Sequence, residues 1–101
     1  MKKLFVKPSH FFRVLAGTPR SQAAEMVLEP GQTTGRSDNK YPASDQWLYV
    51  VSGNGAAAVE GKRIEIEQGA LLLIEAGETH EIKNEGKILL KTINFYCPPA
   101  F

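Results

Sequence analysis

The sequence predicts an all-β fold, an antiparallel jelly roll of two sheets formed by one domain spanning residues 1–101. Short segments rich in β-branched and aromatic residues alternate with turn residues, whereas apolar residues at helical spacing are hard to find. Three tight turns join successive segments as hairpins, which makes the sheets antiparallel: Gly53-Asn54-Gly55, Glu60-Gly61-Lys62 and Asn84-Glu85-Gly86-Lys87. Periodicity alone leaves an immunoglobulin-like sandwich as the alternative.

The first part of the chain predicts three strands and one long loop. Strands are expected over Leu4–Val6 and Phe11–Leu15, where apolar and aromatic residues cluster, and over Ala23–Glu29, which ends at a proline. The loop Pro30–Asp45 is rich in Gly, Thr, Ser, Asp and Asn. Because it is long for a connection within a compact domain, we expect it to be functional or flexible.

The second part predicts six strands. Trp47–Ser52 is apolar on both faces, as expected for a strand that lines a barrel on one side and packs on a second layer with the other. In Arg63–Glu67 isoleucines alternate with charged residues, which indicates one face on solvent. The six strands are Trp47–Ser52, Ala56–Glu60, Arg63–Glu67, Ala70–Glu75, His80–Lys83 and Ile88–Tyr96.

Composition and charge narrow the function classes. Hydrophobic residues make up 43% of the 101 residues, and the formal net charge is +1 without a basic tract, so we expect no nucleic-acid partner. The start MKKLFV imitates a signal peptide only briefly, and no stretch is apolar enough to span a bilayer, so we expect no membrane association. A single cysteine agrees with a reducing compartment, and we expect a cytoplasmic protein.

One sixteen-residue stretch, GALLLIEAGETHEIKN from Gly69 to Asn84, holds a histidine at a defined distance from two glycines and an asparagine. It resembles the second signature of the cupin superfamily, G-x5-P-x-G-x2-H-x3-N. Gly69, Gly77, His80 and Asn84 fall on its fixed positions, and Glu75 replaces the proline. The resemblance implies a small single-domain cupin with a conserved β-barrel, and a metal bound by the histidine.

A second stretch, QWLYVVSG from Gln46 to Gly53, resembles the end of the first cupin signature, E-x6-G, with glutamine in place of the carboxylate. Counting back through a four-residue spacer puts Asn39 and Tyr41 on the two histidine positions of that signature. The first metal-binding motif is therefore degenerate, and His80 is the remaining member of the four-ligand set that the resemblance implies. The likeness covers roughly the last two thirds of the chain, from Glu29 onward.

The candidate pocket residues are Asn39, Tyr41, Gln46 and His80, with His80 as the candidate metal ligand. His80 has two further interpretations, as an acid or base in a metal-free pocket and as a hydrogen-bonded structural residue. The Gln46 amide both donates and accepts, so it suits a polar ligand or a buried hydrogen-bond anchor. A divalent transition metal stays a candidate cofactor with an incomplete ligand set, because such sites want three or four imidazole, thiolate or carboxylate donors.

Three functional hypotheses follow. The leading one is a cupin that binds a small polar molecule in its barrel with weak or no metal binding. The alternative is a metal-dependent cupin enzyme of dioxygenase or isomerase type, in which His80 is joined by Tyr41, Gln46 or a shifted Asp45. The third is a dimerising interaction module. As in many cupin dimers that this sequence resembles, the N-terminal strands of residues 1–20 then lie at a homodimer interface, where Leu4–Val6 adds to the neighbouring subunit's sheet.

Overall fold

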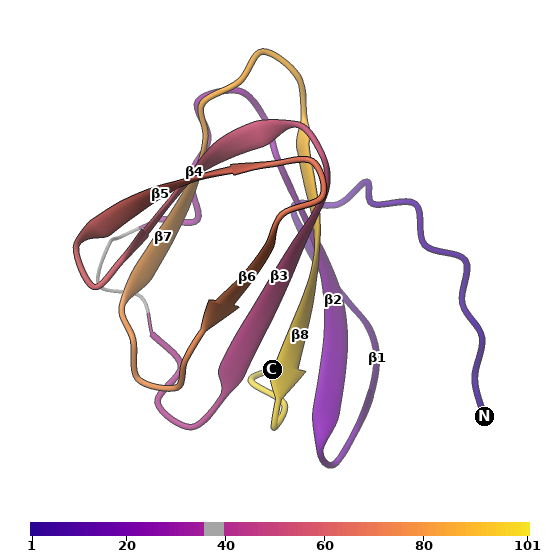
Figure 1. Ribbon diagram of the computed structural model, residues 1–101. Helices are drawn as coiled ribbons and strands as arrows, with labels where there is room; N and C mark the ends of the chain where they lie inside the picture. The colour runs from indigo at the N-terminus through magenta and orange to yellow at the C-terminus, as the bar shows by residue number, and fades with distance from the viewer. Residues whose placement is uncertain (36–39) are drawn as a thin grey trace.

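The computed structural model describes residues 1–35 and 40–101, and these residues form strands and loops without a helix (Figure 1). The all-β prediction is confirmed, and none of the described residues forms a helix that could span a membrane. The turn glycines adopt the positive φ angles that the hairpins require, 89° at Gly53 and 76° at Gly61. The strands are β1 (Phe12–Thr18), β2 (Ser21–Leu28), β3 (Asp45–Ser52), β4 (Asn54–Val59), β5 (Lys62–Glu67), β6 (Leu71–Ile74), β7 (His80–Asn84) and β8 (Leu90–Cys97).

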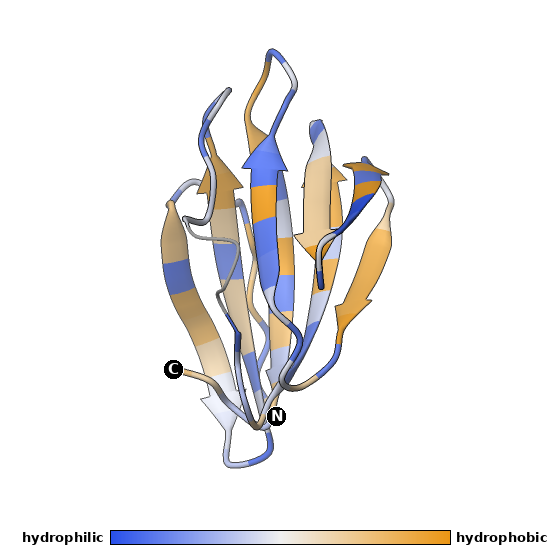
Figure 2. Cartoon of the chain, turned by 90° about the vertical axis from the view of Figure 1, so that its left-hand side faces the viewer, coloured by the Kyte–Doolittle hydropathy of each residue, from blue (hydrophilic) through white to orange (hydrophobic). Residues whose placement is uncertain are grey.

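The strands form two antiparallel sheets that face each other (Figure 1). The larger sheet has the order β1-β2-β8-β3-β6 and the smaller one the order β5-β4-β7. This is the predicted jelly roll, built as two separate sheets rather than a closed barrel. Hydrophilic and hydrophobic residues alternate on the smaller sheet, on the side of the molecule that faces the viewer in Figure 2.

The predicted strand Leu4–Val6 is wrong. Residues 1–11 form no strand and run beside β1 as an extended N-terminal arm (Figure 1). Phe5 is 91% exposed, so the segment buries little apolar surface that would hold it against a sheet edge. The arm is fixed only near its end, where the buried Glu25 carboxylate accepts hydrogen bonds from the Ser9 and His10 amides and from Arg13.

The strand register arranges the inner-face residues of the larger sheet in rows. The rows are Gln22, Tyr96, Gln46 and Ile74; then Ala24, Asn94, Leu48 and Leu72; then Met26, Thr92 and Val50; and finally Leu28 and Leu90. We call the end of the interior at the first row the open end, and the end at the last row the closed end. The two ends lie along the same strands, so one set of hydrogen-bonded ladders positions both.

The closed end is packed and its polar groups are paired. Leu28, Val50 and Leu90 are fully buried there. Asn84 donates to the backbone oxygens of Leu28 and Ile88, both at 2.8 Å, and accepts a hydrogen bond from the Gly86 amide at 2.8 Å. The signature asparagine is therefore a buried anchor of the turn that follows β7.

The outer face of the larger sheet is apolar and exposed. Trp47 lies between Leu73 and Phe95 in the register, and the next row places Tyr49 beside Leu71. These side chains are 39% to 59% exposed. Exposed apolar faces of this kind are typical of interaction surfaces, and the predicted homodimer stays a prediction.

Candidate functional site

A cavity of about 260 Å³ occupies the open end, between the larger sheet and β7. Its polar side chains come from distant parts of the chain, with Gln46 on β3, His80 on β7, Tyr96 on β8 and Tyr41 in the loop before β3. The full lining is Phe11, Phe12, Met26, Thr34, Tyr41, Gln46, His80, Ile82, Tyr96 and Phe101. The cavity is therefore mostly apolar, with a few convergent polar groups, which is the usual character of a small-molecule site.

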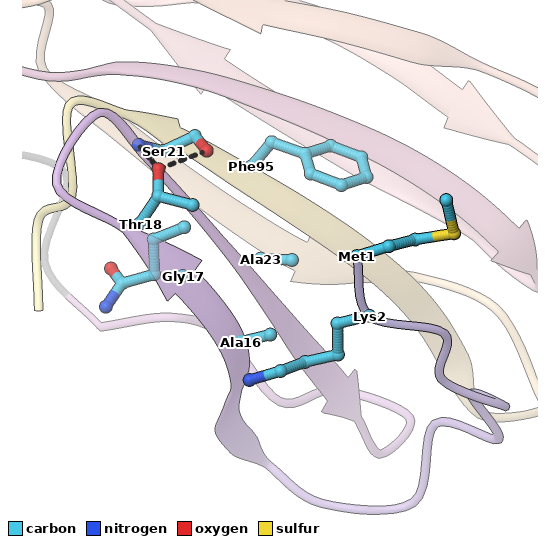
Figure 3. A pocket seen from close by; sticks show the side chains of 9 residues that line it. Met1, Lys2, Ala16, Gly17, Thr18, Ser21, Ala23 and Phe95 are labelled. Atoms are coloured by element: carbon cyan, nitrogen blue, oxygen red, sulfur yellow. Dashed lines mark hydrogen bonds between the residues drawn. The ribbon is translucent and has the colours of Figure 1, made fainter.

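A larger hollow of about 470 Å³ lies outside the sandwich, between the N-terminal arm and the outer face of β2 and β8 (Figure 3). Figure 3 shows small side chains along its floor, with Phe95 and the arm residues Met1 and Lys2 around it. Its hydroxyl groups, those of Thr18 and Ser21, already lie 3.2 Å from each other. No buried polar atom of this hollow is left unpaired among the described residues, so the open-end cavity is the candidate site.

Aromatic rings form one side of the cavity. The Tyr41 ring centroid lies 5.3 Å from that of His80, 5.3 Å from that of Tyr96 and 5.4 Å from that of Phe101. Phe101 lies 5.1 Å from Tyr96 and 4.5 Å from Phe12. These spacings are typical of tilted and edge-to-face pairs, which hold the rings in place and present flat surfaces to the cavity.

The side chain of Gln22 holds Phe101 in this wall. Its Nε2 donates to the Phe101 carbonyl oxygen at 2.8 Å, and its Oε1 accepts from the Phe101 amide at 3.1 Å and from the Ala100 amide at 3.3 Å. Gln22 is 8% exposed and Phe101 57% exposed, so these bonds are partly shielded from water. The position of one cavity wall thus depends on a side chain of β2.

A line of polar groups runs from the cavity toward the core along the inner face of the larger sheet. Gln46 Nε2 donates to Asn94 Oδ1 at 3.0 Å, and Asn94 Nδ2 donates to Thr92 Oγ1 at 3.1 Å. The Thr92 hydroxyl donates to the Met26 carbonyl oxygen at 3.0 Å. All three side chains are buried, and each hydrogen bond fixes the orientation of the next group.

The cavity end of this line is incomplete. Gln46 is 3% exposed, and its Oε1 has no hydrogen-bond partner. Among the side chains of residues 1–35 and 40–101, this is the one buried nitrogen or oxygen atom left unpaired. An unpaired buried acceptor costs about 1–3 kcal/mol, which a bound molecule with a suitable donor recovers.

His80 is held in its neutral form with a defined tautomer. Its Nδ1 lies 3.4 Å from the Glu78 carbonyl oxygen, which only accepts, so this contact favours the proton on Nδ1 and leaves Nε2 as an acceptor. Burial lowers the pKa of His80, and the Glu78 carbonyl opposes this shift only in part. At neutral pH the ring therefore offers an acceptor and no charge.

The two tyrosines of the cavity stay protonated. Burial raises the pKa of the Tyr41 phenol. The pKa of Tyr96 is raised further, by burial and by the neighbouring Tyr41 hydroxyl. Neither phenol is therefore a ready phenolate, and both hydroxyls keep a proton that can be donated.

This donor set does not fit a divalent transition metal. The cavity offers one imidazole nitrogen, one amide oxygen and two phenols whose pKa values are raised, which makes the phenolate form needed for ligation costly. No group of three or more His, Cys, Asp or Glu side chains suited to a metal ion occurs in the part of the chain that the structure describes.

The structure brings three of the four sequence-predicted residues to one cavity, namely Tyr41, Gln46 and His80. Asn39 lies outside the described residues. The substitute carboxylate Asp45 is not part of the cavity wall, because its Oδ1 accepts a hydrogen bond from the Ala76 amide at 2.9 Å in the turn after β6. A one-residue shift along β3 turns its side chain away from Gln46, as the strand period requires.

Sequence reasoning missed the aromatic residues of the wall and the buried part of the polar line. Tyr96 faces Gln46 only through the pairing of β3 with β8, which no local pattern discloses. Thr92, Asn94 and Tyr96 alternate with less buried residues along β8, which is a period-two signal. Polar residues at that period usually indicate a solvent face, so the signal pointed away from the interior.

Comparison with known proteins identifies the family of this chain. The family model described as the cupin domain matches residues 24–96. The tetracenomycin polyketide synthase protein TcmJ of Streptomyces glaucescens is 27% identical over 73 residues, which is 72% of this chain and 48% of that protein. The oxalate-binding protein of Thermotoga maritima is 32% identical over 63 residues, 62% of this chain and 50% of that protein. The chain thus spans about half the length of these curated relatives.

Solved structures resemble the fold closely. BH2720 from Bacillus halodurans superposes with a TM-score of 0.85 at 28% identity, covering 90% of this chain and 72% of that one. A predicted oxalate decarboxylase from Thermotoga maritima superposes with a TM-score of 0.71 at 27% identity, covering 77% and 66%. KdgF from Halomonas sp., at 21% identity and a TM-score of 0.74 over 87% of this chain and 77% of that one, is alike in fold alone.

Proposed function

Because this chain belongs to the cupin family, we propose that it binds a small polar organic molecule in the open-end cavity, with weak or no affinity for a transition metal. The observation that carries the proposal is the buried, unpaired Oε1 of Gln46 at the cavity. A fold rarely keeps such an atom unless something pairs with it. His80 and Tyr41, on other elements, add an acceptor and a hydroxyl at the same cavity.

The relatives support a binding role for this fold. The Thermotoga maritima relative is named an oxalate-binding protein, so a cupin of related sequence is named for holding a small molecule. Fold and family do not specify the ligand, because unrelated chemistries occur on the same scaffold. The ligand has to be argued from the residues of this cavity.

A fragment screen followed by NMR tests the proposal. The panel contains small alcohols, phenols, amides, amines and carboxylic acids, and the readout is the side-chain resonances of Gln46, His80 and Tyr41. We expect at least one class to shift these resonances saturably in the wild-type protein and in the control Gln68→Leu, where an exposed glutamine is changed. The same class should bind at least about tenfold more weakly to Gln46→Leu. Binding that never reaches the cavity resonances would contradict the proposal.

The second candidate is a metal-dependent dioxygenase or isomerase that uses His80. One observation favours it: His80 and Gln46 line the same cavity, and both His80 Nε2 and Gln46 Oε1 carry lone pairs that could coordinate a metal ion. Elemental analysis of untagged protein purified without chelator separates the two candidates. We expect metal far below one ion per chain in the wild type. A near-stoichiometric metal that is lost in His80→Ala and kept in the control His10→Ala would favour the enzyme and contradict the metal-free proposal.

A further inference from the structure

The polarity of the line of buried amides and hydroxyls is fixed at its inner end by the backbone. The Met26 carbonyl oxygen only accepts, so the single proton of the Thr92 hydroxyl is committed to it. Thr92 Oγ1 must then accept from Asn94, which turns the Asn94 amide so that Nδ2 points at Thr92 and Oδ1 points at Gln46. Gln46, whose side chain lines the cavity, therefore donates through Nε2, and its acceptor Oε1 is left without a partner.

The alternative orientations of these amides would each lose a hydrogen bond of the line. If Gln46 were turned over, its Oε1 would face Asn94 Oδ1, and two acceptors would meet in a buried place. If Asn94 were turned over as well, its Oδ1 would face a Thr92 hydroxyl that has already given its proton to Met26. The backbone of β2 thus determines, through three side chains, that the cavity presents an acceptor.

His80 has the same preference, whereas the Tyr41 and Tyr96 hydroxyls of the cavity keep protons that they can donate. His80 adds a second acceptor through Nε2, because Nδ1 faces the Glu78 carbonyl. None of the described residues that line the cavity is Lys or Arg. A carboxylate bound there would bring oxygen acceptors against Gln46 Oε1 and His80 Nε2 with no positive charge to offset its desolvation.

The apolar part of the cavity wall favours a flat ligand. Phe12, Tyr41, Tyr96 and Phe101 form one contiguous group of rings, with neighbouring ring centroids 4.5 Å to 5.4 Å apart. A flat ring fits against such a surface through stacked or edge-to-face contacts. At about 260 Å³ the cavity is at the small end of ligand sites, which suits a molecule of one or two rings.

From this geometry, and resting on the proposed binding function, we infer that the ligand class is an uncharged aromatic compound with a hydroxyl or N–H group. The hydroxyl or N–H donates to Gln46 Oε1 or to His80 Nε2, and the ring lies against the aromatic wall. Oxalate and other small carboxylates, although one relative is named for oxalate, are not the ligands of this cavity.

Matched probes of similar size test this inference in the wild-type protein. The probes are benzyl alcohol as the neutral donor, benzaldehyde as the neutral acceptor, benzoate as the anion, and cyclohexylmethanol as the donor without an aromatic ring. Affinities come from NMR titration of the Gln46 and His80 side-chain resonances. We expect benzyl alcohol to bind at least about tenfold more tightly than benzaldehyde or benzoate, since only the alcohol satisfies the unpaired acceptor. Cyclohexylmethanol should bind more weakly than benzyl alcohol.

Variants test whether Gln46 causes the preference for a ligand that donates a hydrogen bond. In Gln46→Leu the advantage of benzyl alcohol over benzaldehyde should shrink to less than about threefold, whereas the exposed control Gln68→Leu should keep it. The double variant Gln46→Leu, Asn94→Leu removes both partners of one hydrogen bond. It replaces Gln46→Leu in the same titrations if the single variant folds poorly.

Each failure has a separate meaning. Benzoate or benzaldehyde binding as tightly as the alcohol at the cavity resonances would overturn the ligand class and leave the binding function standing. An absence of cavity shifts with every probe, together with a negative fragment screen, would overturn both.

Discussion

The two ends of the interior are built on the same strands and differ in how completely their polar groups are satisfied. At the closed end Asn84 uses both amide hydrogens and its oxygen, all in bonds of 2.8 Å to the backbone. At the open end Gln46 uses one side of its amide and leaves the other unpaired beside a cavity. The comparison teaches that the same pair of sheets can hold a stable core and an unsatisfied site a few residues apart, because the strand register fixes both.

The difference has an energetic consequence. Leaving a buried acceptor unpaired costs about 1–3 kcal/mol, which is a substantial fraction of the stability of a small domain. The packed closed end, with Leu28, Val50 and Leu90 fully buried, has to offset this cost. Substitutions at the closed end should therefore change stability, and substitutions at the open end should change binding.

The largest expected effect is that of Leu90→Ala at the closed end. Leu90 is fully buried, so its truncation should lower the free energy of unfolding by about 2–5 kcal/mol through lost burial and a cavity. Urea denaturation measures the change, with Leu71→Ala as the control on the outer face, where the side chain is 59% exposed. A loss below about 1 kcal/mol would mean that the closed end is not the stabilising part of the interior.

Asn84→Ala should follow, with a loss of about 2–3 kcal/mol. The substitution leaves the Leu28 and Ile88 carbonyls and the Gly86 amide without their partners. Denaturation with urea checks this, and Gln68→Ala is an exposed amide control. If a fragment found in the screen binds to folded Asn84→Ala with unchanged affinity, then binding at the open end is independent of the closed end. A loss of affinity in parallel with the loss of stability would contradict this independence.

At the open end, Asn94→Leu should cost more stability than Gln46→Leu. Removing Asn94 leaves the whole Gln46 amide unpaired, for a loss of about 1–3 kcal/mol. Removing Gln46 deletes the unpaired acceptor while freeing only Asn94 Oδ1, so the two changes nearly cancel, within about 1 kcal/mol. Thermal and urea unfolding of the two variants measure the order, and the reverse order would contradict the derived polarity of the line.

The smallest effect is a pH dependence at His80. Because its pKa in the folded protein is lowered below the ordinary 6.5, the unfolded chain takes up the proton first. The stability that neutral His80 contributes is present above pH 6.5 and is lost as the pH falls toward the folded pKa. Unfolding measured from pH 8 down to pH 5 should show this decline, and His80→Phe should reduce it.

Much of the fold was predictable because turns and strand patterns are local. Glycine turns and alternating strands predicted all eight strands of the described residues, whereas Leu4–Val6 failed because three apolar residues do not disclose whether a sheet edge will bury them. In the site, the resemblance to the two cupin signatures identified Tyr41, Gln46 and His80 as candidates, since signature positions reflect strand register. Tyr96 and Phe101 were not predictable, because they reach the cavity through long-range pairing and through the Gln22 clamp.

The opposite orientation of Trp47 and the cavity tyrosines gives the protein one optical reporter on each side of the larger sheet. The chain has one tryptophan, and its indole lies on the outer face of the larger sheet, 39% exposed, beside Leu73 and Phe95. Tyr41 and Tyr96 lie inside, on the cavity. Tryptophan fluorescence should therefore respond to whatever covers the outer face and stay nearly constant as the cavity fills. Tyrosine absorbance should follow occupation of the cavity once the outer-face Tyr49 has been changed to Phe.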